Sequence, residues 1–307
     1  VPATANCIAK IAHGIADDLL TTTAVAIHCR KIIAPAMNVN MWNNKIFKKN
    51  LEILKENDWE IIEPDEGMLA CGYTGKGKLA AVDTIISHIK GSQLLKGRKV
   101  VVTAGGTIED IDPVRYISNR SSGTMGIKFA EEARNMGADV FLIHGNINNA
   151  VPYGVKGIGI RSATDMLEAL NEIIDDSDML VMAAAVADYR VDKIADEKIK
   201  KTEDDFTLIL KKNPDILKTL SSKKGERVFI AFALETENLL KNAEKKLKEK
   251  NSDLLVANST KEEISPFGGD KSKVFLLHKD GRIDEMPMML KKEIAIKVLT
   301  EAAGLLK

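Results

Sequence analysis

The stretch Val100–Gly126, VVVTAGGTIEDIDPVRYISNRSSGTMG, predicts the centre of the fold. It begins with an apolar, β-branched run that ends at the pair Gly105 and Gly106, which is typical of a buried strand leading into a tight turn. A polar loop follows, and the apolar spacing after Gly123 predicts a helix over 125–136. A strand, a glycine turn and a helix start in this order present backbone N–H groups to phosphate, so an α/β fold with a phosphate-containing ligand is favoured.

The stretch lacks the two standard nucleotide fingerprints, because it contains neither GxGxxG nor GxxxxGK[ST]. Elsewhere, residues 72–78 fit GxxxxGK, but Leu79 stands where a P-loop has its metal-binding Ser or Thr, and no strand leads directly into them. A purely structural interpretation remains open, in which Gly105 and Gly106 only turn the chain. That interpretation leaves the density of polar residues in the loop unexplained.

Composition excludes several classes of protein. The 307 residues carry 44 Lys plus Arg and 44 Asp plus Glu, and this zero net charge argues against nucleic acid as a partner. The three cysteines form no CxxC pair, which argues against a disulfide framework or a zinc site and favours the reducing cytoplasm. No apolar run reaches about 18–20 residues, so we expect no membrane span.

Strands and helices alternate in the second part of the chain. Alternation of this kind predicts a Rossmann-like, doubly wound and mostly parallel sheet, with ligand at the carboxyl ends of its strands. The predicted strands are 99–104, 139–144, 179–184, 228–233 and 254–258, and the predicted helices are 125–136, 164–175, 214–223 and 237–250. Two antiparallel additions are also expected: a hairpin flap pairing 198–200 with 206–210, and a strand at 273–277.

The first ninety residues predict a smaller α/β domain. A core-facing helix is expected over 6–20 with Asn6 as its N-cap, and a second helix over 44–57 with Ile46 facing inward. Strands are expected at 31–34 and 59–62, and a last helix at 83–90. We place this domain at 1–90, a linker at 91–95 and the larger domain at 96–307.

Several polar residues follow predicted strand ends. The small residues at 182–187 allow a flat ring to approach the backbone, and Asp188 then offers an acceptor, although tight packing explains the alanines equally well. The charged run 197–201 is either a solvated surface or a set of ammonium groups for phosphate. Asn213-Pro214-Asp215 is a helix start that suits a cap or an anion contact. Cys71 is either a buried small side chain or a catalytic thiol.

These motifs together resemble a known family. TAGGTIEDIDPVRYISNRSSGTMG, AAAVADYR, EKIKK, KKNPDIL and AFALETEN resemble the phosphopantothenoylcysteine synthetase domain over residues 96–307. ATANCIAKIAHGIADDLLTT, PAMN and GMLACG resemble the C-terminal part of the flavin-dependent phosphopantothenoylcysteine decarboxylase, an α/β flavodoxin-like domain that is fused in front of it. The resemblance is therefore to the bifunctional coenzyme A biosynthesis enzymes, without the beginning of the decarboxylase domain.

The resemblance implies a reaction and a set of residues for the larger domain. It implies CTP-dependent activation of 4′-phosphopantothenate as an acyl-cytidylate, followed by amide formation with cysteine, with Mg²⁺ accompanying the triphosphate; it identifies no metal ligands. Asn119 is implied to hold the acyl-phosphate region, and Lys198 to reach the phosphates and the acyl-cytidylate. The remaining CTP-binding residues implied by the resemblance are Met182, Ala183, Ala184, Asp188, Pro214, Asp215, Ile216, Leu217, Phe232, Lys246 and Lys250.

For the first domain, the resemblance implies FMN as cofactor. Asn38 is implied to bind substrate, Cys71 to supply a proton to the enethiol intermediate, and Thr4 and Asn6 to contact FMN. The family's catalytic histidine has no counterpart here, because His13 and His28 lie in a different motif context, so we expect this chain to lack decarboxylase activity. Relatives form synthetase dimers and larger assemblies, which implies a homo-oligomer.

Two other functions stay open. A Rossmann oxidoreductase would retain NAD(P), and the missing GxGxxG counts against it. A non-catalytic nucleotide-binding or assembly module is the second alternative. No single contact visible in the sequence selects CTP over ATP.

Overall fold

The computed structural model describes residues 2–68, 72, 74–201, 206–235, 237–259 and 269–307. The chain divides into two compact units, Val1–Ser92 and Gln93–Lys307, and each is considered by itself. In the described residues no helix is both long and apolar enough to cross a membrane.

The first unit is a small α/β arrangement. Strands β1 and β2 pair in parallel, and β3 and β4 form an antiparallel hairpin. Buried side chains from α1, α3 and α4, among them Ile8, Trp42 and Leu54, form its main core. In chain order its elements are α1 (Ala5–Ala12), α2 (Leu19–Ala26), β1 (Lys31–Ile33), α3 (Val39–Asn43), α4 (Lys45–Glu56), β2 (Trp59–Ile61), β3 (Asp65–Met68), β4 (Thr74–Lys78) and α5 (Val82–Lys90).

The prediction of one core-facing helix over 6–20 is wrong. Helix α1 ends at Ala12, because Gly14 adopts a left-handed conformation (φ 68°), and α2 begins at Leu19 after a new capping residue, Asp18. Thr4 caps α1 in place of Asn6. Leu19 is 85% exposed, and Ile46, expected to face inward, is 72% exposed at the first turn of α4.

The second unit is built on an eight-stranded sheet. The strand order is β16-β15-β14-β13-β10-β5-β8-β9, and all neighbours from β14 to β9 pair in parallel, whereas β15 and β16 are antiparallel additions. The strands are β5 (Lys99–Ala104), β8 (Asp139–His144), β9 (Lys156–Gly159), β10 (Met179–Met182), β13 (Val228–Glu235), β14 (Leu254–Ser259), β15 (Lys271–His278) and β16 (Ile283–Leu290). The chain is therefore a mixed α/β protein with a large, mostly parallel sheet.

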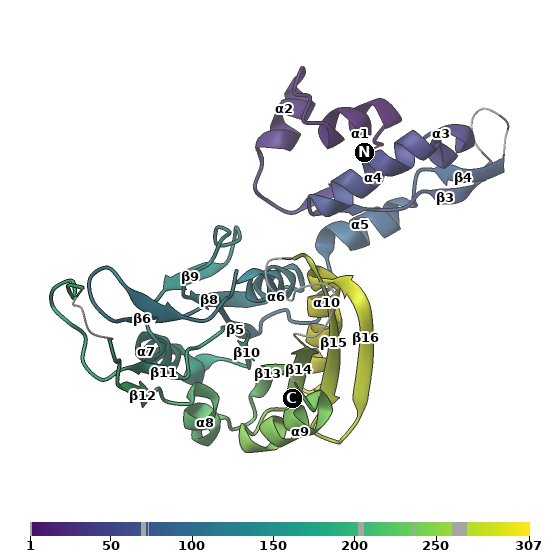
Figure 1. The fold of residues 1–307 in the computed structure, drawn as a ribbon. Helices are drawn as coiled ribbons and strands as arrows, with labels where there is room; N and C mark the ends of the chain where they lie inside the picture. The colour runs from purple at the N-terminus through teal and green to yellow at the C-terminus, as the bar shows by residue number, and fades with distance from the viewer. Residues whose placement is uncertain (1, 69–71, 73, 202–205, 236, 260–268) are drawn as a thin grey trace. The chain divides into compact units, whose positions relative to one another are not determined.

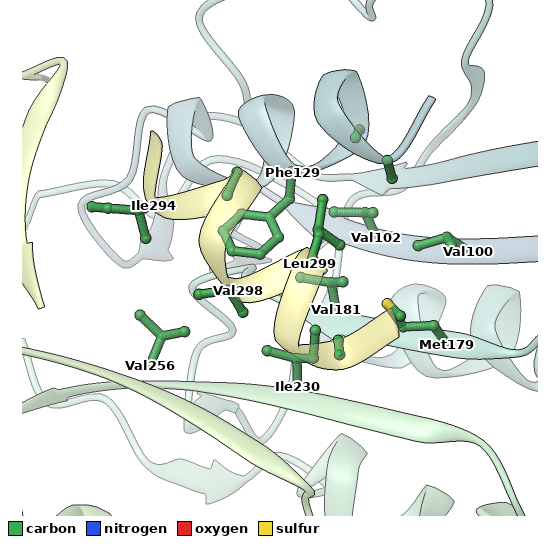
Figure 2. Close-up of a cluster of buried hydrophobic side chains, with 14 of the residues drawn as sticks. Val100, Val102, Phe129, Met179, Val181, Ile230, Val256, Ile294, Val298 and Leu299 are labelled. Atoms are coloured by element: carbon green, nitrogen blue, oxygen red, sulfur yellow. The ribbon is translucent and has the colours of Figure 1, made fainter. Parts of the chain in front are cut away.

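Helices cover both faces of this sheet (Figure 1). Alternate residues of β5 enter different cores, because successive strand side chains point to opposite faces: Val100 and Val102 join one cluster and Val101 the other. Figure 2 shows the first cluster, where Phe129 and Val298 pack over the strands. Helices α6 (Thr124–Asn135) and α10 (Lys291–Ala303) cover this face, and α7 (Ala163–Ile173), α8 (Ile216–Leu220) and α9 (Leu239–Glu249) cover the other.

Two predicted elements of this unit differ from the structure. Strand β10 ends at Met182, so Ala183 and Ala184 lie in the loop after it. The predicted flap exists, but its antiparallel strands are β11 (Tyr189–Val191) and β12 (Leu210–Lys212) rather than 198–200 and 206–210. Residues 202–205 of that prediction lie outside the described residues.

A second small hairpin follows the first strand of the sheet. Strand β6 (Ile108–Asp110) pairs antiparallel with β7 (Tyr116–Ser118), and the chain then runs through 119–123 into α6. This hairpin occupies most of the polar loop that the sequence singled out.

Candidate active site

A cavity of about 610 Å³ lies where the order of the parallel strands reverses, between β5 and β10. This is the position at which open α/β sheets bind ligands. Its volume is within the range of small-molecule sites. Its walls come from the loop and helix start at 119–126, the loop at 182–188, the segment 213–217, the end of β13 at 232–234, and Lys250, Asn258 and Lys291.

Two threonines of the first strand and its turn shape the loop at 182–188. The Thr103 hydroxyl accepts a hydrogen bond from the Ala184 N–H (3.1 Å), and the Thr107 hydroxyl accepts one from the Ala187 N–H (3.0 Å). Both threonines are buried. They hold the alanine-rich backbone against the glycine turn, and Ala183, Ala184, Ala185 and Ala187 bring only methyl groups to this wall.

The start of α6 comes unusually close to β5. A Cβ placed on Gly126 would lie 2.6 Å from the Thr103 carbonyl oxygen, so only glycine fits this position. Gly123, with φ 76°, turns the chain into the helix. Because residues 121–126 line the cavity, the positive N-terminal end of α6 faces it, which favours an anionic ligand.

Asn119 is fixed at the cavity wall. Its side-chain Nδ2 donates to the Val186 carbonyl (2.9 Å), which joins the loop after β7 to the loop after β10. Asp188 lines the same cavity, and its backbone carbonyl accepts from the Asn213 N–H (2.8 Å). The Asn213 side chain donates to the Ala187 carbonyl (2.9 Å), so this asparagine connects the alanine-rich loop to the segment before α8.

The far wall carries a charged pair and an aromatic ring. Asp215 caps α8 and lies 3.8 Å from the Lys250 ammonium, and both line the cavity. The Phe232 ring also lines it and packs edge-on against Phe129, with ring centroids 5.3 Å apart. The Lys250 ammonium therefore places a cation at the cavity wall.

The structure brings together most of the residues singled out from the sequence. The predicted site residues that line this one cavity are Asn119, Met182, Ala183, Ala184, Asp188, Pro214, Asp215, Ile216, Leu217, Phe232 and Lys250. Two lysines are not among the lining residues. Lys246 forms an ion pair with Glu235 (2.6 Å), and Lys198 is exposed on the segment before 202.

Sequence analysis did not identify Thr103, Thr107 and Lys291, nor the bridging role of the Asn213 side chain. Thr103 and Thr107 resemble ordinary strand and turn residues, and the bridging role of Asn213's side chain depends on a partner 26 positions away. Lys291 lies at the start of α10, is buried and lines the cavity. Burial lowers the pKa of its ammonium, and the charge of Asp270 opposes that shift.

Family models and relatives agree on what this chain resembles. The model for the DNA/pantothenate metabolism flavoprotein C-terminal domain matches residues 95–305, and a flavoprotein model matches residues 1–94. A coenzyme A biosynthesis bifunctional protein CoaBC of Bacillus subtilis is 44% identical over all of this chain and 77% of its own length. The chain belongs to the family of bifunctional coenzyme A biosynthesis proteins, CoaBC.

Two further relatives show the range of this family. A crystal structure of the C-terminal domain of a CoaBC protein is 38% identical, with a TM-score of 0.60, over 70% of this chain and 98% of that one. A cysteine/cysteine sulfinic acid decarboxylase from an unknown prokaryotic organism is 40% identical over 97% of this chain and 86% of its own length. Relatives that match nearly all of this chain thus carry different functional names.

The flavoprotein region of this CoaBC family member contains four of the predicted site residues, and the structure describes three of them. The Thr4 hydroxyl caps α1 by accepting from the Cys7 N–H (3.2 Å), and Asn6 is exposed one residue into that helix. Asn38 caps α3 through the Asn40 N–H (2.8 Å). The Thr4 hydroxyl and the Asn6 amide are groups that can form hydrogen bonds to FMN, and the Asn38 amide can form them to a substrate. Cys71 lies outside the described residues.

The described residues contain no preformed metal site. Over the described ranges, no three His, Cys, Asp or Glu side chains are grouped as metal ligands. Asp188 and Asp215 both line the cavity, but they come from different segments of its wall. Mg²⁺ is commonly held by one or two carboxylates together with substrate phosphates, so these residues fit only a metal that arrives with a nucleotide.

Proposed function

We propose that residues 93–307 join cysteine to 4′-phosphopantothenate in coenzyme A biosynthesis, using CTP. The carboxylate oxygen of 4′-phosphopantothenate attacks the α-phosphorus of CTP, and pyrophosphate leaves. The amine of cysteine then attacks the acyl carbon, CMP leaves, and the amine gives up a proton. The Rossmann-like arrangement of the parallel strands supports this assignment, because the cavity lies at the reversal of strand order.

One observation carries the proposal: a single cavity joins the positive end of α6 to a wall of small residues. The N–H groups of 121–126 suit the phosphate being attacked, where negative charge increases in the transition state. Ala183 and Ala184 leave room for a flat pyrimidine ring, and Lys250 supplies a cation for the triphosphate. Asn119, held by the Val186 carbonyl, is placed to bind the acyl-phosphate group.

Lys198 and Mg²⁺ complete the proposed site. Lys198 reaches the phosphates from the segment at 195–201, and Lys246 contributes after separating from Glu235. Asp188 or Asp215, which line the cavity, would help to hold Mg²⁺ bound to the triphosphate, and the ion would offset phosphate charge.

The decisive experiment measures pyrophosphate release from CTP and 4′-phosphopantothenate, first without cysteine and then with it. We expect cysteine-independent pyrophosphate release in a single turnover and CMP release when cysteine is added. Lys198→Gln is expected to slow the first step by about 100-fold, as for removal of one donor to a developing charge. The matched control is Lys193→Gln, another exposed lysine of the same loop.

Other outcomes would identify the alternatives. Retention of NAD(P) with no pyrophosphate release would favour an oxidoreductase, and tight nucleotide binding without turnover would favour a binding module. ATP in place of CTP tests nucleotide choice, which we propose to be CTP.

A second proposal concerns the flavoprotein region. We propose that residues 1–92 belong to the part of the protein that binds FMN and decarboxylates 4′-phospho-N-pantothenoylcysteine, with Asn38 on the substrate and Cys71 as proton donor. The match of the flavoprotein model to residues 1–94 supports the flavin. FMN would supply the oxidation and reduction that accompany the decarboxylation. Titration of the wild type and of Thr4→Ala with FMN, followed by flavin fluorescence, tests the proposed contact between Thr4 and FMN, and weaker binding is expected in the variant. We also propose that the chain forms a homo-oligomer. Light scattering tests this, because an oligomer has a multiple of the molar mass of one chain.

A further inference from the structure

The turn of the β6–β7 hairpin is hydrogen-bonded to a segment that is distant in the sequence, residues 195–199. Asp112 in this turn is 1% exposed, and one of its oxygens accepts from the N–H groups of Val114 (2.9 Å) and Arg115 (2.8 Å). Its other oxygen accepts from the N–H of Ile199 (3.1 Å), which is 87 positions away. One buried carboxylate therefore shapes its own turn and holds a second backbone segment.

Arg115 of the same turn forms hydrogen bonds to both Asp112 and Ile199. Its Nε donates to Asp112 Oδ2 (3.0 Å), and its Nη2 donates both to that oxygen and to the Ile199 carbonyl (2.8 Å). A neighbouring backbone bond, from the Ala195 N–H to the Ile111 carbonyl (3.0 Å), extends the attachment. The guanidinium, together with three backbone N–H groups, holds the pKa of the Asp112 carboxyl well below its usual range. The carboxylate therefore stays charged and keeps accepting these bonds near neutral pH.

The hairpin itself is anchored at its base and leads into the cavity. Asp110 of β6 forms a two-bond ion pair with Arg161 (2.6 Å each), and the Ile108 N–H donates to the Arg161 carbonyl (2.7 Å). At this same open end of the hairpin, where Ser118 pairs with Ile108, β7 stops and the next residue is Asn119 on the cavity wall. The same hairpin thus leads into Asn119 and is hydrogen-bonded to Ile199, the residue beside Lys198.

We propose that Asp112 is a positioning residue, which presents Lys198 to the bound nucleotide by holding the backbone of Ile199 against the β6–β7 hairpin. This inference rests on the proposed function, because it takes from it the role of Lys198. The Lys198 side chain is long, exposed and not part of the cavity wall. Fixing its backbone beforehand reduces the ordering required when the side chain meets phosphate.

The test compares two carboxylates of the same hairpin. Asp112→Asn replaces one acceptor oxygen with an NH₂ group that faces N–H donors, so residue 112 can no longer accept hydrogen bonds both from its own turn and from the Ile199 N–H. Asp110→Asn is the matched control, because Asp110 pairs with Arg161, and the bonds described for it do not include the segment 195–199.

The first readout is trypsin cleavage of the native, ligand-free protein after Lys198 and Lys200. Release of the segment in Asp112→Asn is expected to speed cleavage there by about 10-fold, since proteolysis follows local opening. Cleavage in Asp110→Asn is expected to match the wild type. Unchanged cleavage in Asp112→Asn would overturn the inference.

The second readout is kinetic. For pyrophosphate release, Asp112→Asn is expected to lower kcat by about 10-fold with little change in the KM for CTP, because the lost interaction acts on the reacting phosphates. In a Lys198→Gln background the same change is expected to have no further effect, as it acts only through Lys198. Additive effects would show general damage and would contradict the positioning role.

The outcomes separate this inference from the proposed function. If the wild type releases no pyrophosphate, the proposed function fails and the role of Lys198 fails with it. If the wild type is active and Asp112→Asn retains full kcat although its segment is released, only the positioning role is wrong. Should Asp112→Asn not fold, Ile199→Pro removes the N–H at the other end of the bond; a lower kcat and faster cleavage after Lys200 are then expected, and wild-type values would refute the inference.

Discussion

The two units of this chain bury their apolar residues in different ways. In residues 93–307, helices cover both faces of an eight-stranded sheet, and side chains such as Phe129 and Phe229 are fully buried. In residues 1–92, the described strands occur in pairs, and Leu19, Ile46 and Met68 are largely exposed. The larger unit therefore buries its apolar side chains between the sheet and two layers of helices, whereas the smaller unit buries them mainly among the short helices α1, α3 and α4.

The largest expected effect comes from truncating one aromatic side chain in each core. Phe129→Ala is expected to destabilise the larger unit by about 3–5 kcal/mol, because it removes a fully buried ring that packs on Phe232. The matched change is Phe47→Ala in the core of the smaller unit. Calorimetry is expected to show two transitions, each moved by one substitution. A single transition moved by both would mean that the units unfold together.

A smaller effect is expected from adding one methyl group at a glycine of each unit. Gly126→Ala would place its Cβ 2.6 Å from the Thr103 carbonyl oxygen and from the Ala104 Cβ, which costs about 1–3 kcal/mol and shifts the start of α6 at the cavity. Gly67→Ala in β3 meets only the flexible Lys78 side chain at 3.5 Å. Urea unfolding measures both, and pyrophosphate release is expected to fall only in Gly126→Ala. Equal stabilities would refute the close approach.

The sequence predicted the parts of the fold that depend on local patterns. Strands Lys99–Ala104 and Asp139–His144 are confirmed at both ends, because each is a continuous apolar run bounded by polar or glycine residues. Strand β9, with the sequence KGIG, carries no such pattern and was missed. The flap strands were misplaced because their pairing, Tyr189 with Lys212, is decided by tertiary contacts.

The candidate site shows the same division. The glycine-rich loop and the alanine-rich segment after β10 have recognisable compositions, and the structure places both on one cavity. The roles of Thr103, Asn213 and Asp112 arise from partners between 26 and 87 positions away, so no local spacing reveals them. Helix α1 was extended too far because apolar spacing continued past Gly14, whose left-handed backbone ends the helix.

The smallest expected effect compares two helix caps, because both units contain a capping box. Ser162→Ala at α7 removes the acceptor for the Asp165 N–H and is expected to cost about 1 kcal/mol at any pH from 5 to 8. Asp18→Ala at α2 is expected to lower the melting temperature of the smaller unit in a pH-dependent way. Hydrogen bonds from the Thr21 N–H and hydroxyl lower the pKa of Asp18. Its stabilising effect is therefore present above the unfolded aspartate pKa of about 3.9 and is lost as the pH falls through the lower folded value. Melting curves of Asp18→Ala and the wild type are thus expected to differ at pH 7 and to converge in acid, and a constant difference would contradict the charged cap.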